Sequence, residues 1–569
     1  MAHFHIKRKK GRPYLYVREI ARVGGKPKVV NQVYIGSPQR VADLASGGQG
    51  AVKLRVEEFG ALWLANQIDQ EIDLARIVDE VIPKDSREDG LSVGEYFLYC
   101  VLNRMCEAVS KNKLSGWYEK TAIQSIRPVA VSELTSQRYW DKWDRVSEDD
   151  LKAIAKAFFE KIWRTASPKA DCLLFDTTNY YTFMASDTES ELAKKGKNKE
   201  GRDSLRQVGL GLLVARETRL PLYYCVYPGN LHDSRQFEAV LGEMFGVVMD
   251  LCQPKERLTL VIDKGMNSKD NFALIDEHAR VHFVTTYSTY FEPDLAAVDL
   301  KAFDVLDTKE NKEAPEKDKI LVFRTRSEYW GKERSVVLTY NPKTARKQAY
   351  SLLAKLGTVR DELLVMRQKV RDKEPHWRNP DKIKQRYLGL CERLHLPSDL
   401  YVLEFTKAQD RLSMSFRKDV PKVNGKLETL GKSIIISDNT DWTTSEIVRA
   451  SLDRWQVENA FRQSKDDDLV AMRPIRHWTD SKISCHLFSC VVALTYLRLI
   501  ELRLKKHGVD RTAGDVMDDM RGLHSVLLLS QGKRKAERRL EIPTKTQSEV
   551  LSAFGRYVDD GGVLHSKSP

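Results

Sequence analysis

The sequence predicts an α/β fold with a central sheet between residues 171 and 286. In this region, short apolar runs typical of buried strands alternate with two helical segments, in the order β-β-β-α-β-α-β. The run Leu258–Ile262 lacks the alternation of a one-sided sheet, which predicts a central strand covered on both faces. The composition, 42% apolar and 30% charged, is that of a globular protein and excludes disordered, collagen-like and fibrous classes.

Each segment of this core is bounded by polar residues. Asp233 followed by Gln236 is a helix-start signal, so a helix is expected from this point. The expected strands are 172–175, 208–215, 222–227, 258–262 and 281–286, and the expected helices are 233–250 and 270–278.

The rest of the chain suggests several further units, because 569 residues are enough for three or four. The N-terminal region contains a predicted β-hairpin at 13–35 with a turn at Gly24-Gly25. It continues as helices over 51–167, the last with a capping box at Ser147 and Asp150. We expect an N-terminal basic and helical region (1–168), a first core part (169–287), an insertion (288–440), core helices (441–507) and a C-terminal tail (508–569).

The insertion is predicted to be mainly β around two helices. Its strand-like segments are 320–325, 334–340, 401–405, 412–416 and 433–437. The first helix carries apolar residues at spacings of four and three, which form a heptad seam: Leu352, Leu356, Val359, Leu363, Met366 and Val370. A second helix follows a break at 375–380, with Tyr387, Cys391 and Leu394 facing the first. The two helices are interpreted as a hairpin packed on itself or, alternatively, as a dimerising arm.

Cysteine usage and hydropathy indicate the compartment. The eight cysteines form no C-x-x-C pair, which disfavours a disulfide framework or structural zinc and fits a reducing compartment. The N-terminus lacks the apolar segment of a secretory signal. The least polar stretch, 483–500, contains His486, Ser489 and Arg498, so it predicts a buried helix rather than a membrane span. We therefore expect a soluble protein with no membrane partner.

The net charge of +13 is concentrated in basic clusters. Each cluster alone is typical of a solvated surface, but three in one chain favour a polyanionic partner. The first includes Lys7, Arg8, Lys9, Lys10 and Arg12, the second Lys195, Lys197 and Arg202, and the third lies at 533–539.

Two aspartates follow apolar strand-like runs. Asp176 comes directly after Phe175, and Asp263 comes directly after Ile262. A carboxylate that emerges from a buried strand is costly unless it is paired or bound to a cation. If the two strands are neighbours, both carboxylates project near one edge of the sheet. The alternative is that each aspartate only forms a turn.

A third acid, Glu458, lies in a segment predicted to be one helix from about 443 to 465, with capping residues at its start. On this helix Ser451, Arg454, Glu458 and Lys465 fall within a stripe of about 60°, so an acid is flanked by two cations. A surface ladder of ion pairs is the alternative. P-loop, dinucleotide-binding, zinc-protease and α/β-hydrolase motifs are absent from the sequence.

These residues resemble the Y-(2)-R-(3)-E-(6)-K signature of bacterial insertion-sequence transposases of the DDE type. Arg454, Glu458 and Lys465 match it in identity and spacing, and Ser451 replaces the tyrosine. The segments around Asp176, 227–230, 262–268 and 473–486 resemble further motifs of the family, in the same order. The resemblance spans 170–500 and implies an RNase H-like, retroviral-integrase-like core that is interrupted by a large β-rich insertion.

The resemblance implies that Asp176, Asp263 and Glu458 are the catalytic, metal-binding residues. Their oxygen-only ligands fit two Mg²⁺ ions, or Mn²⁺, rather than zinc. It further implies cleavage at the terminal inverted repeats and strand transfer into target DNA, in a cut-and-paste manner. Arg454 and Lys465 would bind phosphates beside the scissile bond.

Outside the catalytic residues, we expect Lys and Arg to contact DNA phosphates, and such contacts do not depend on the base sequence. The N-terminal residues Lys7, Arg8, Lys9, Lys10 and Arg12 would supply affinity for the terminal repeats, and Lys195, Lys197 and Arg202 would contact target DNA. We expect a homodimer in the DNA complex and a bacterial cytoplasmic, nucleoid-associated location.

Two other functions are compatible with the same residues. One is a nuclease with the same core that cuts DNA without joining strands. The other is a catalytically inert DNA-binding protein derived from a transposase. Nicking and binding assays of Asp263→Asn distinguish these readings.

Overall fold

The structure, a computed structural model, forms two compact units, which are described separately. Unit 1 consists of Met1–Glu256 and Trp455–Pro569, and unit 2 of Arg257–Arg454. The residues described are 2–9, 12–23, 26–36, 38, 41, 53–169, 171–184, 188–196, 201–202, 204–231, 233–251, 257–408, 411–529 and 536–567.

Unit 1 begins with a three-stranded antiparallel sheet of β1 (Ala2–Lys9), β2 (Arg12–Val23) and β3 (Lys26–Gly36). Strands β2 and β3 confirm the predicted hairpin, and β1 extends it. The predicted turn at Gly24-Gly25 lies outside the described residues. A second sheet joins β4 (Lys53–Glu58) to β17 (His524–Leu529), which also pairs with β18 (Glu537–Leu540). The prediction of helix from residue 51 is therefore wrong for β4, because pairing with a distant strand is not visible in local periodicity.

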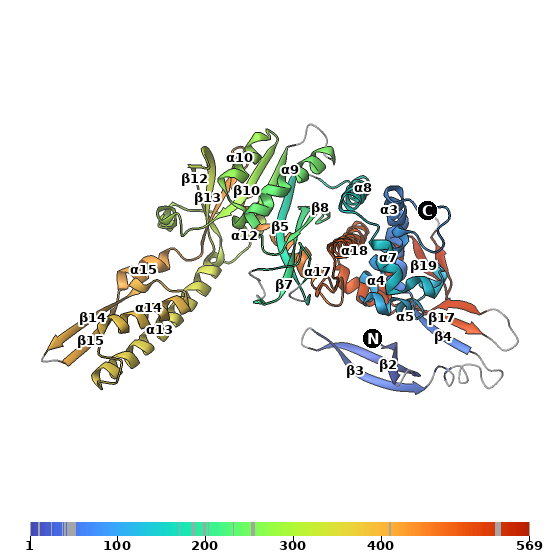
Figure 1. The fold of residues 1–569 in the computed structure, drawn as a ribbon, viewed down its shortest axis with the longest axis horizontal. Helices are drawn as coiled ribbons and strands as arrows, with labels where there is room; N and C mark the ends of the chain where they lie inside the picture. The colour runs from blue at the N-terminus through green and yellow to red at the C-terminus, as the bar shows by residue number, and fades with distance from the viewer. Residues whose placement is uncertain are drawn as a thin grey trace. The chain divides into compact units, whose positions relative to one another are not determined.

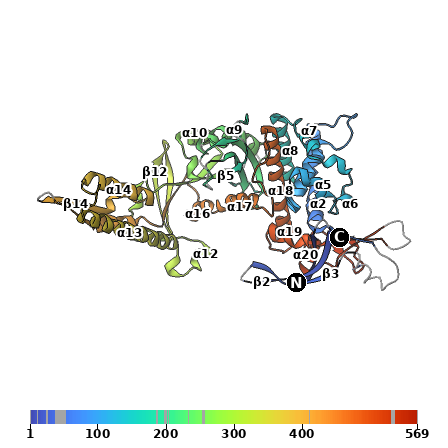
Figure 2. The same ribbon diagram turned by 60° about the horizontal axis from the view of Figure 1, so that its bottom comes forward.

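The helices of unit 1 pack around one buried helix, α18 (Asp480–Lys506), which contacts α4 and α8 (Figures 1 and 2). The Ser147–Asp150 capping box at the start of α8 is confirmed. Within the described residues, α18 is the one helix long and apolar enough to cross a membrane, and 89% of its apolar window is buried inside the protein. This confirms the predicted buried helix. The other helices of the N-terminal region are α2 (Gly60–Ile72), α3 (Leu74–Val81), α4 (Val93–Cys106), α5 (Leu114–Tyr118), α6 (Ile123–Ile126), α7 (Ser136–Trp143) and α8 (Glu148–Ala166).

The sheet of unit 1 that matters for the site has β7 (Arg206–Ala215) between β5 (Cys172–Thr182) and β8 (Pro221–Pro228), all antiparallel. The two-residue strand β6 (Lys194–Lys195) pairs with the beginning of β7. The unit also contains α9 (Asp233–Leu251), α17 (Trp455–Ser464), α19 (Ala513–Arg521), α20 (Lys545–Ala553), β19 (Arg556–Val558) and β20 (Leu564–Ser566). The seven cysteines of the described residues are free and buried, as expected without a disulfide framework.

Unit 2 contains a mixed sheet in the order β11-β12-β13-β16-β10-β9. Strands β9 (Leu258–Ile262) and β10 (Val281–Tyr287) are parallel, and all five residues of β9 are buried, as predicted. The remaining strands are β11 (Asp304–Val305), β12 (Leu321–Tyr329), β13 (Lys332–Tyr340) and β16 (Lys432–Ser437), and the helices beside them are α10 (Lys269–Glu277), α11 (Pro293–Ala296), α12 (Lys309–Lys312) and α16 (Thr444–Leu452).

This sheet changes the predicted organisation. Strands β12, β13 and β16 come from the predicted insertion, yet β16 pairs directly with β10 of the predicted core. The two compact units divide after residues 256 and 454, and the predicted functional regions 1–168, 169–287, 288–440, 441–507 and 508–569 stay a prediction. The sequence predicted that β12, β13 and β16 are strands. It could not predict which strands pair, because the choice of neighbour depends on tertiary contacts.

The rest of the predicted insertion, 342–430, forms an arm with its own apolar core. It consists of α13 (Pro342–Arg371), α14 (Pro380–Leu394), β14 (Tyr401–Ala408), β15 (Arg411–Lys418) and α15 (Val420–Glu428). All six residues of the predicted heptad seam are buried, and they pack with Tyr387 and Cys391 of α14. Leu394 is partly buried against the same cluster. The helical hairpin packed on itself is therefore confirmed.

Candidate active site

Asp176 lies in the middle of β5. Every residue from 173 to 182 pairs with β7, and Asp176 is opposite Leu212. The prediction that Asp176 closes its strand is wrong, because the Thr- and Tyr-rich residues after it also favour a strand. Asp176 is half-buried, and the backbone N–H of Thr177 donates to its Oδ1 over 2.8 Å.

The face of β5 that carries Asp176 is covered by α17. Side chains alternate along a strand, so Asp176, Thr178 and Tyr180 share one face. On this face Lys465 Nζ donates to Thr178 Oγ1 over 2.9 Å, and Ser464 Oγ lies 2.6 Å from the Tyr180 hydroxyl. Lys465 Nζ also lies 5.4 Å from the centroid of the Tyr180 ring. The sequence pattern around Asp176 contained Thr178, but only the packing of α17 reveals its role as the anchor of Lys465.

Lys465 directly follows α17, and its backbone N–H donates to the Phe461 carbonyl over 3.1 Å, so it continues the last helical turn. Glu458 and Lys465 therefore lie on one face, because seven residues are close to two helical turns. Glu458 is exposed and lines a shallow cavity of about 470 Å³ together with Lys465 and Arg473. The other lining residues are Phe461, Arg462 and Asp466. Three cations beside two acids form a surface that can hold a phosphate next to a carboxylate.

The predicted single helix from 443 to 465 is wrong. Helix α16 ends at Leu452, Asp453 and Arg454 form a turn, and α17 begins at Trp455. The capping residues predicted at the start are confirmed, since Thr443 and Glu446 form a capping box.

The break divides the predicted stripe. Ser451 belongs to α16 and Arg454 to the turn, so neither shares a continuous helix with Glu458. Of the predicted stripe, the structure keeps only Glu458 and Lys465 on one face. Arg454 lies at the break and forms an ion pair with a residue distant in sequence, and helical periodicity could not reveal this ion pair.

Arg454 forms that ion pair with Asp263, which directly follows β9 in unit 2. Burial alone would raise the pKa of Asp263, but the Arg454 guanidinium and the Lys264 backbone N–H favour the carboxylate and lower the pKa below its ordinary value. Asp263 is therefore ionised at neutral pH. Its predicted position at a strand end is confirmed.

The structure describes the side chains of only some of the predicted DNA-binding residues in the basic clusters. Lys7 is exposed on β1, Lys195 is exposed on β6, and the Arg202 guanidinium lies 4.5 Å from the centroid of the Tyr181 ring. Arg8, Lys9 and Arg12 lie in β1 and β2, and their side chains are outside the description, as are Lys10 and Lys197 altogether.

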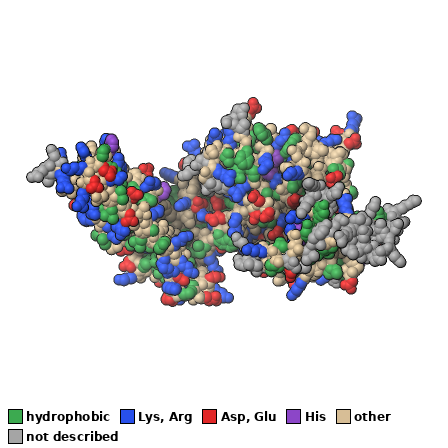
Figure 3. Space-filling view, turned by 90° about the horizontal axis from the view of Figure 1, so that it is seen from below, with side chains coloured by type: hydrophobic (Ala, Val, Ile, Leu, Met, Phe, Trp, Pro, Cys, Tyr) green, Lys and Arg blue, Asp and Glu red, His purple; other side chains and the backbone are tan. Residues whose placement is uncertain are grey.

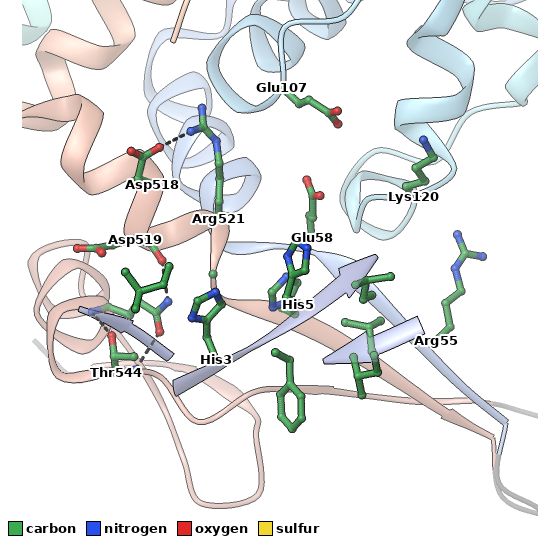
Figure 4. A pocket seen from close by; sticks show the side chains of 18 of the residues that line it. His3, His5, Arg55, Glu58, Glu107, Lys120, Asp518, Asp519, Arg521 and Thr544 are labelled. Carbon is green, nitrogen blue, oxygen red and sulfur yellow. Dashed lines mark hydrogen bonds and ion pairs between the residues drawn. The ribbon is translucent and has the colours of Figure 1, made fainter. Parts of the chain in front are cut away.

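A larger cavity of about 1500 Å³ elsewhere in unit 1 is a poor candidate for the site (Figure 4). Acidic side chains from separate elements line it, among them Glu58, Glu107 and Asp519. Burial, and next the neighbouring Glu107, raise the pKa of Glu58. Asp176, Glu458 and Lys465 do not line this cavity. Its lining also includes cations such as Arg55, Lys120 and Arg521, so it has no single charge, and it has none of the predicted catalytic residues.

Residues 167–496, more than half of the chain, match the family described as transposase DDE domain. The chain belongs to the DDE transposase family. Its α/β core is therefore the RNase H-like domain of this family, and this domain is a phosphoryl-transfer catalyst. The matched range contains Asp176, Asp263 and Glu458 as well as the arm.

One solved structure in the comparison is a piggyBac transposase synaptic complex with hairpin DNA. It is 10% identical, with 82% of each chain covered and a TM-score of 0.37. No curated protein matches the chain.

DDE transposases use divalent metal ions, and the donor set predicted here fits such ions. Asp176, Asp263 and Glu458 offer only carboxylate oxygens, which are the ligands that hard divalent cations prefer. Within the described residues, no three His, Cys, Asp or Glu side chains form a group that could hold a metal ion. The assembly of the three acids into one centre stays a prediction.

Proposed function

We propose that the protein is the transposase of a bacterial insertion sequence, which binds the terminal inverted repeats of its element, cleaves the DNA ends and joins them to target DNA. Membership in the DDE family supports a phosphoryl-transfer reaction. The observation that carries the proposal is the packing of α17 on β5, which joins the Asp176 face of the strand to the helix of Glu458.

In this proposal Asp176, Asp263 and Glu458 hold two Mg²⁺ or Mn²⁺ ions. When bound, such ions activate the attacking oxygen and stabilise the leaving oxygen of an in-line displacement. The chain itself must then supply ionised ligands and hold the DNA backbone. Asp263 is one such ligand, because its lowered pKa keeps its carboxylate charged at neutral pH.

Lys465 and Arg454 are proposed to contact phosphates beside the reacting bond. Lys465 is held by Thr178 and the Tyr180 ring, which limits its conformational freedom before DNA binds. Arg454 pairs with Asp263, which would be one of the metal ligands, so its guanidinium lies where it could bind a phosphate beside that carboxylate.

The remaining parts of the proposal concern DNA and assembly. Exposed Lys7 and Lys195 would contribute sequence-independent affinity for terminal repeats and target DNA. A homodimer in the DNA complex would bring two element ends together, and the reaction would take place at the nucleoid in the bacterial cytoplasm.

The test is an assay of DNA that carries one element end, with Mg²⁺ and a target plasmid. We expect nicking followed by strand-transfer products for the wild type, and neither product for Asp263→Asn, which should still bind the DNA. Nicking without joined products would favour the nuclease. If wild type and variant bind equally and neither nicks, the inert DNA-binding protein is the correct reading.

A further inference from the structure

The arm, residues 342–430, carries a large share of the charge of the protein. It contains 20 Lys and Arg residues against 11 Asp and Glu, a net charge of +9 out of +13 for the whole chain. Figure 3 shows Lys and Arg side chains gathered on the lobe at the left, which is the arm. The heptad residues of α13 and the buried face of α14 pack in the arm's own core, whereas Tyr350, Val365 and Leu388 are exposed among the charged residues.

Part of this charge is arranged as a stripe along α14. At 100° per residue, Lys382, Arg386, Gly389 and Arg393 fall within about 60° of one another, and the buried residues Leu390, Ile383 and Tyr387 begin about 40° further round the helix. We call these four residues the α14 stripe. All four are exposed. The three cations span about 16 Å of helix, since eleven residues each rise about 1.5 Å.

The cations of the α14 stripe are not neutralised by neighbours. Three acids of the arm pair with cations outside the stripe: Asp361 with Arg360, Glu374 with Lys369, and Asp399 with Lys422. The acids next to the stripe in sequence, Asp381 and Glu392, are exposed, and no ion pair joins either of them to a stripe cation within the described residues. In the part of the chain that the structure describes, neither Lys382 nor Arg393 has an ion-pair partner, and Arg386 contacts only an aromatic ring. A row of unpaired cations is a surface for a polyanion.

Two features prepare this surface for close contact. The Arg386 guanidinium lies 4.1 Å and Lys369 Nζ 5.2 Å from the Trp377 ring centroid, so the ring holds both cations in place. Gly389, in the middle of the stripe, has nothing within 4 Å of the position of an added Cβ. An exposed glycine weakens a helix, and here it leaves the helix backbone open to a partner.

We propose that the α14 stripe binds the phosphate backbone of duplex DNA without reading its sequence, at a place distinct from the predicted catalytic residues. This rests on the proposed function, which makes DNA the polyanion that the protein meets. The stripe adds affinity for DNA on which the active site acts, and it contributes no catalytic group.

The test compares two lysines of one helix. Lys382→Gln removes a stripe cation, whereas Lys384→Gln removes an exposed cation about 160° away on α14. Binding of the full-length protein to a duplex of unrelated sequence is measured across a range of salt concentrations. We expect the slope of log K against log salt to fall by about 0.9 for Lys382→Gln and by about 2.7 for Lys382→Gln/Arg386→Gln/Arg393→Gln, with no change for Lys384→Gln.

Thermal melting of each variant checks that the arm still folds. If the triple variant does not fold, the single variant Lys382→Gln still tests the proposal. An unchanged slope for Lys382→Gln in a folded protein overturns the proposal. Equal losses for Lys382→Gln and Lys384→Gln overturn it too, because the charge would then act diffusely. A loss seen with duplex RNA and not with duplex DNA would assign the stripe to another partner. Metal-dependent nicking of end DNA is measured in parallel, so a failure of the proposed function is seen independently of these slopes.

Discussion

Asp176 and Asp263 follow similar apolar runs, yet the structure gives them different surroundings. Asp176 sits inside a continuing antiparallel strand, on the face covered by α17. Asp263 ends a parallel-sheet strand and is paired with Arg454 from the break between two helices. The comparison teaches that one sequence pattern, an aspartate after a buried run, can produce either a strand-borne acid or a charge-paired acid at a strand end. The two acids should therefore respond differently to substitution.

The largest expected effect comes from Asp176 on β5 and Glu458 on α17. Substitution of either acid should abolish catalysis and leave the protein folded. Asp176→Asn and Glu458→Gln should each lower DNA nicking by more than about 100-fold, the upper end of what losing a second-shell partner of a metal ligand costs. DNA binding should persist, because each change leaves the cations of the surface in place. Nicking within a few-fold of the wild type would remove that residue from the catalytic set.

Arg454 provides the sharpest contrast between the two acids. In Arg454→Ala the cation that lowers the pKa of Asp263 is lost, and burial then raises that pKa. We expect the acidic limb of the pH profile of nicking to move to higher pH, and Arg454→Lys to restore much of its position. An Arg454→Ala enzyme whose activity falls equally at every pH would contradict this electrostatic role.

The contact between α17 and β5 gives a smaller effect on stability. Thr178→Val removes the hydroxyl that accepts from Lys465, and we expect a loss of about 1 kcal/mol in the free energy of unfolding. Ser464→Ala, which removes the partner of the Tyr180 hydroxyl, serves as a matched change one residue away on the same contact. Denaturant unfolding measures both. If neither variant lowers stability, this contact does not hold Lys465 in place.

The smallest effect concerns stability at low pH. Because the folded-state pKa of Asp263 lies below its ordinary value, its contribution is fully present above about pH 4 and is lost as the pH falls through the folded pKa. Asp263→Asn should therefore differ from the wild type near neutral pH and converge with it in acid. A difference that is constant with pH would mean that the Asp263 charge does not stabilise the fold.

Much of the fold could be predicted because local patterns decide it. The burial of β9, the heptad seam of α13 and the capping boxes at Ser147 and Thr443 all follow from residue types at fixed spacings. The helix break at Arg454 could not be predicted, because its ion-pair partner is 191 residues away.

The same limit applies to strand pairing and to the site. The pairing of β16 with β10 joins the predicted insertion to the predicted core, and apolar periodicity cannot choose a strand's neighbour. In the site, the chemistry of Asp176, Asp263 and Glu458 was readable from their types and contexts. The anchoring of Lys465 by Thr178 required the packing of α17 on β5.

The most direct test of the central claim is a titration of the full-length protein with Mn²⁺, followed by electron paramagnetic resonance of the free ion. If Asp176, Asp263 and Glu458 form one metal centre, the wild type binds Mn²⁺ and each of Asp176→Asn, Asp263→Asn and Glu458→Gln binds it much more weakly. If all three variants bind Mn²⁺ as the wild type does, the three acids do not form a metal centre and the proposed mechanism is wrong.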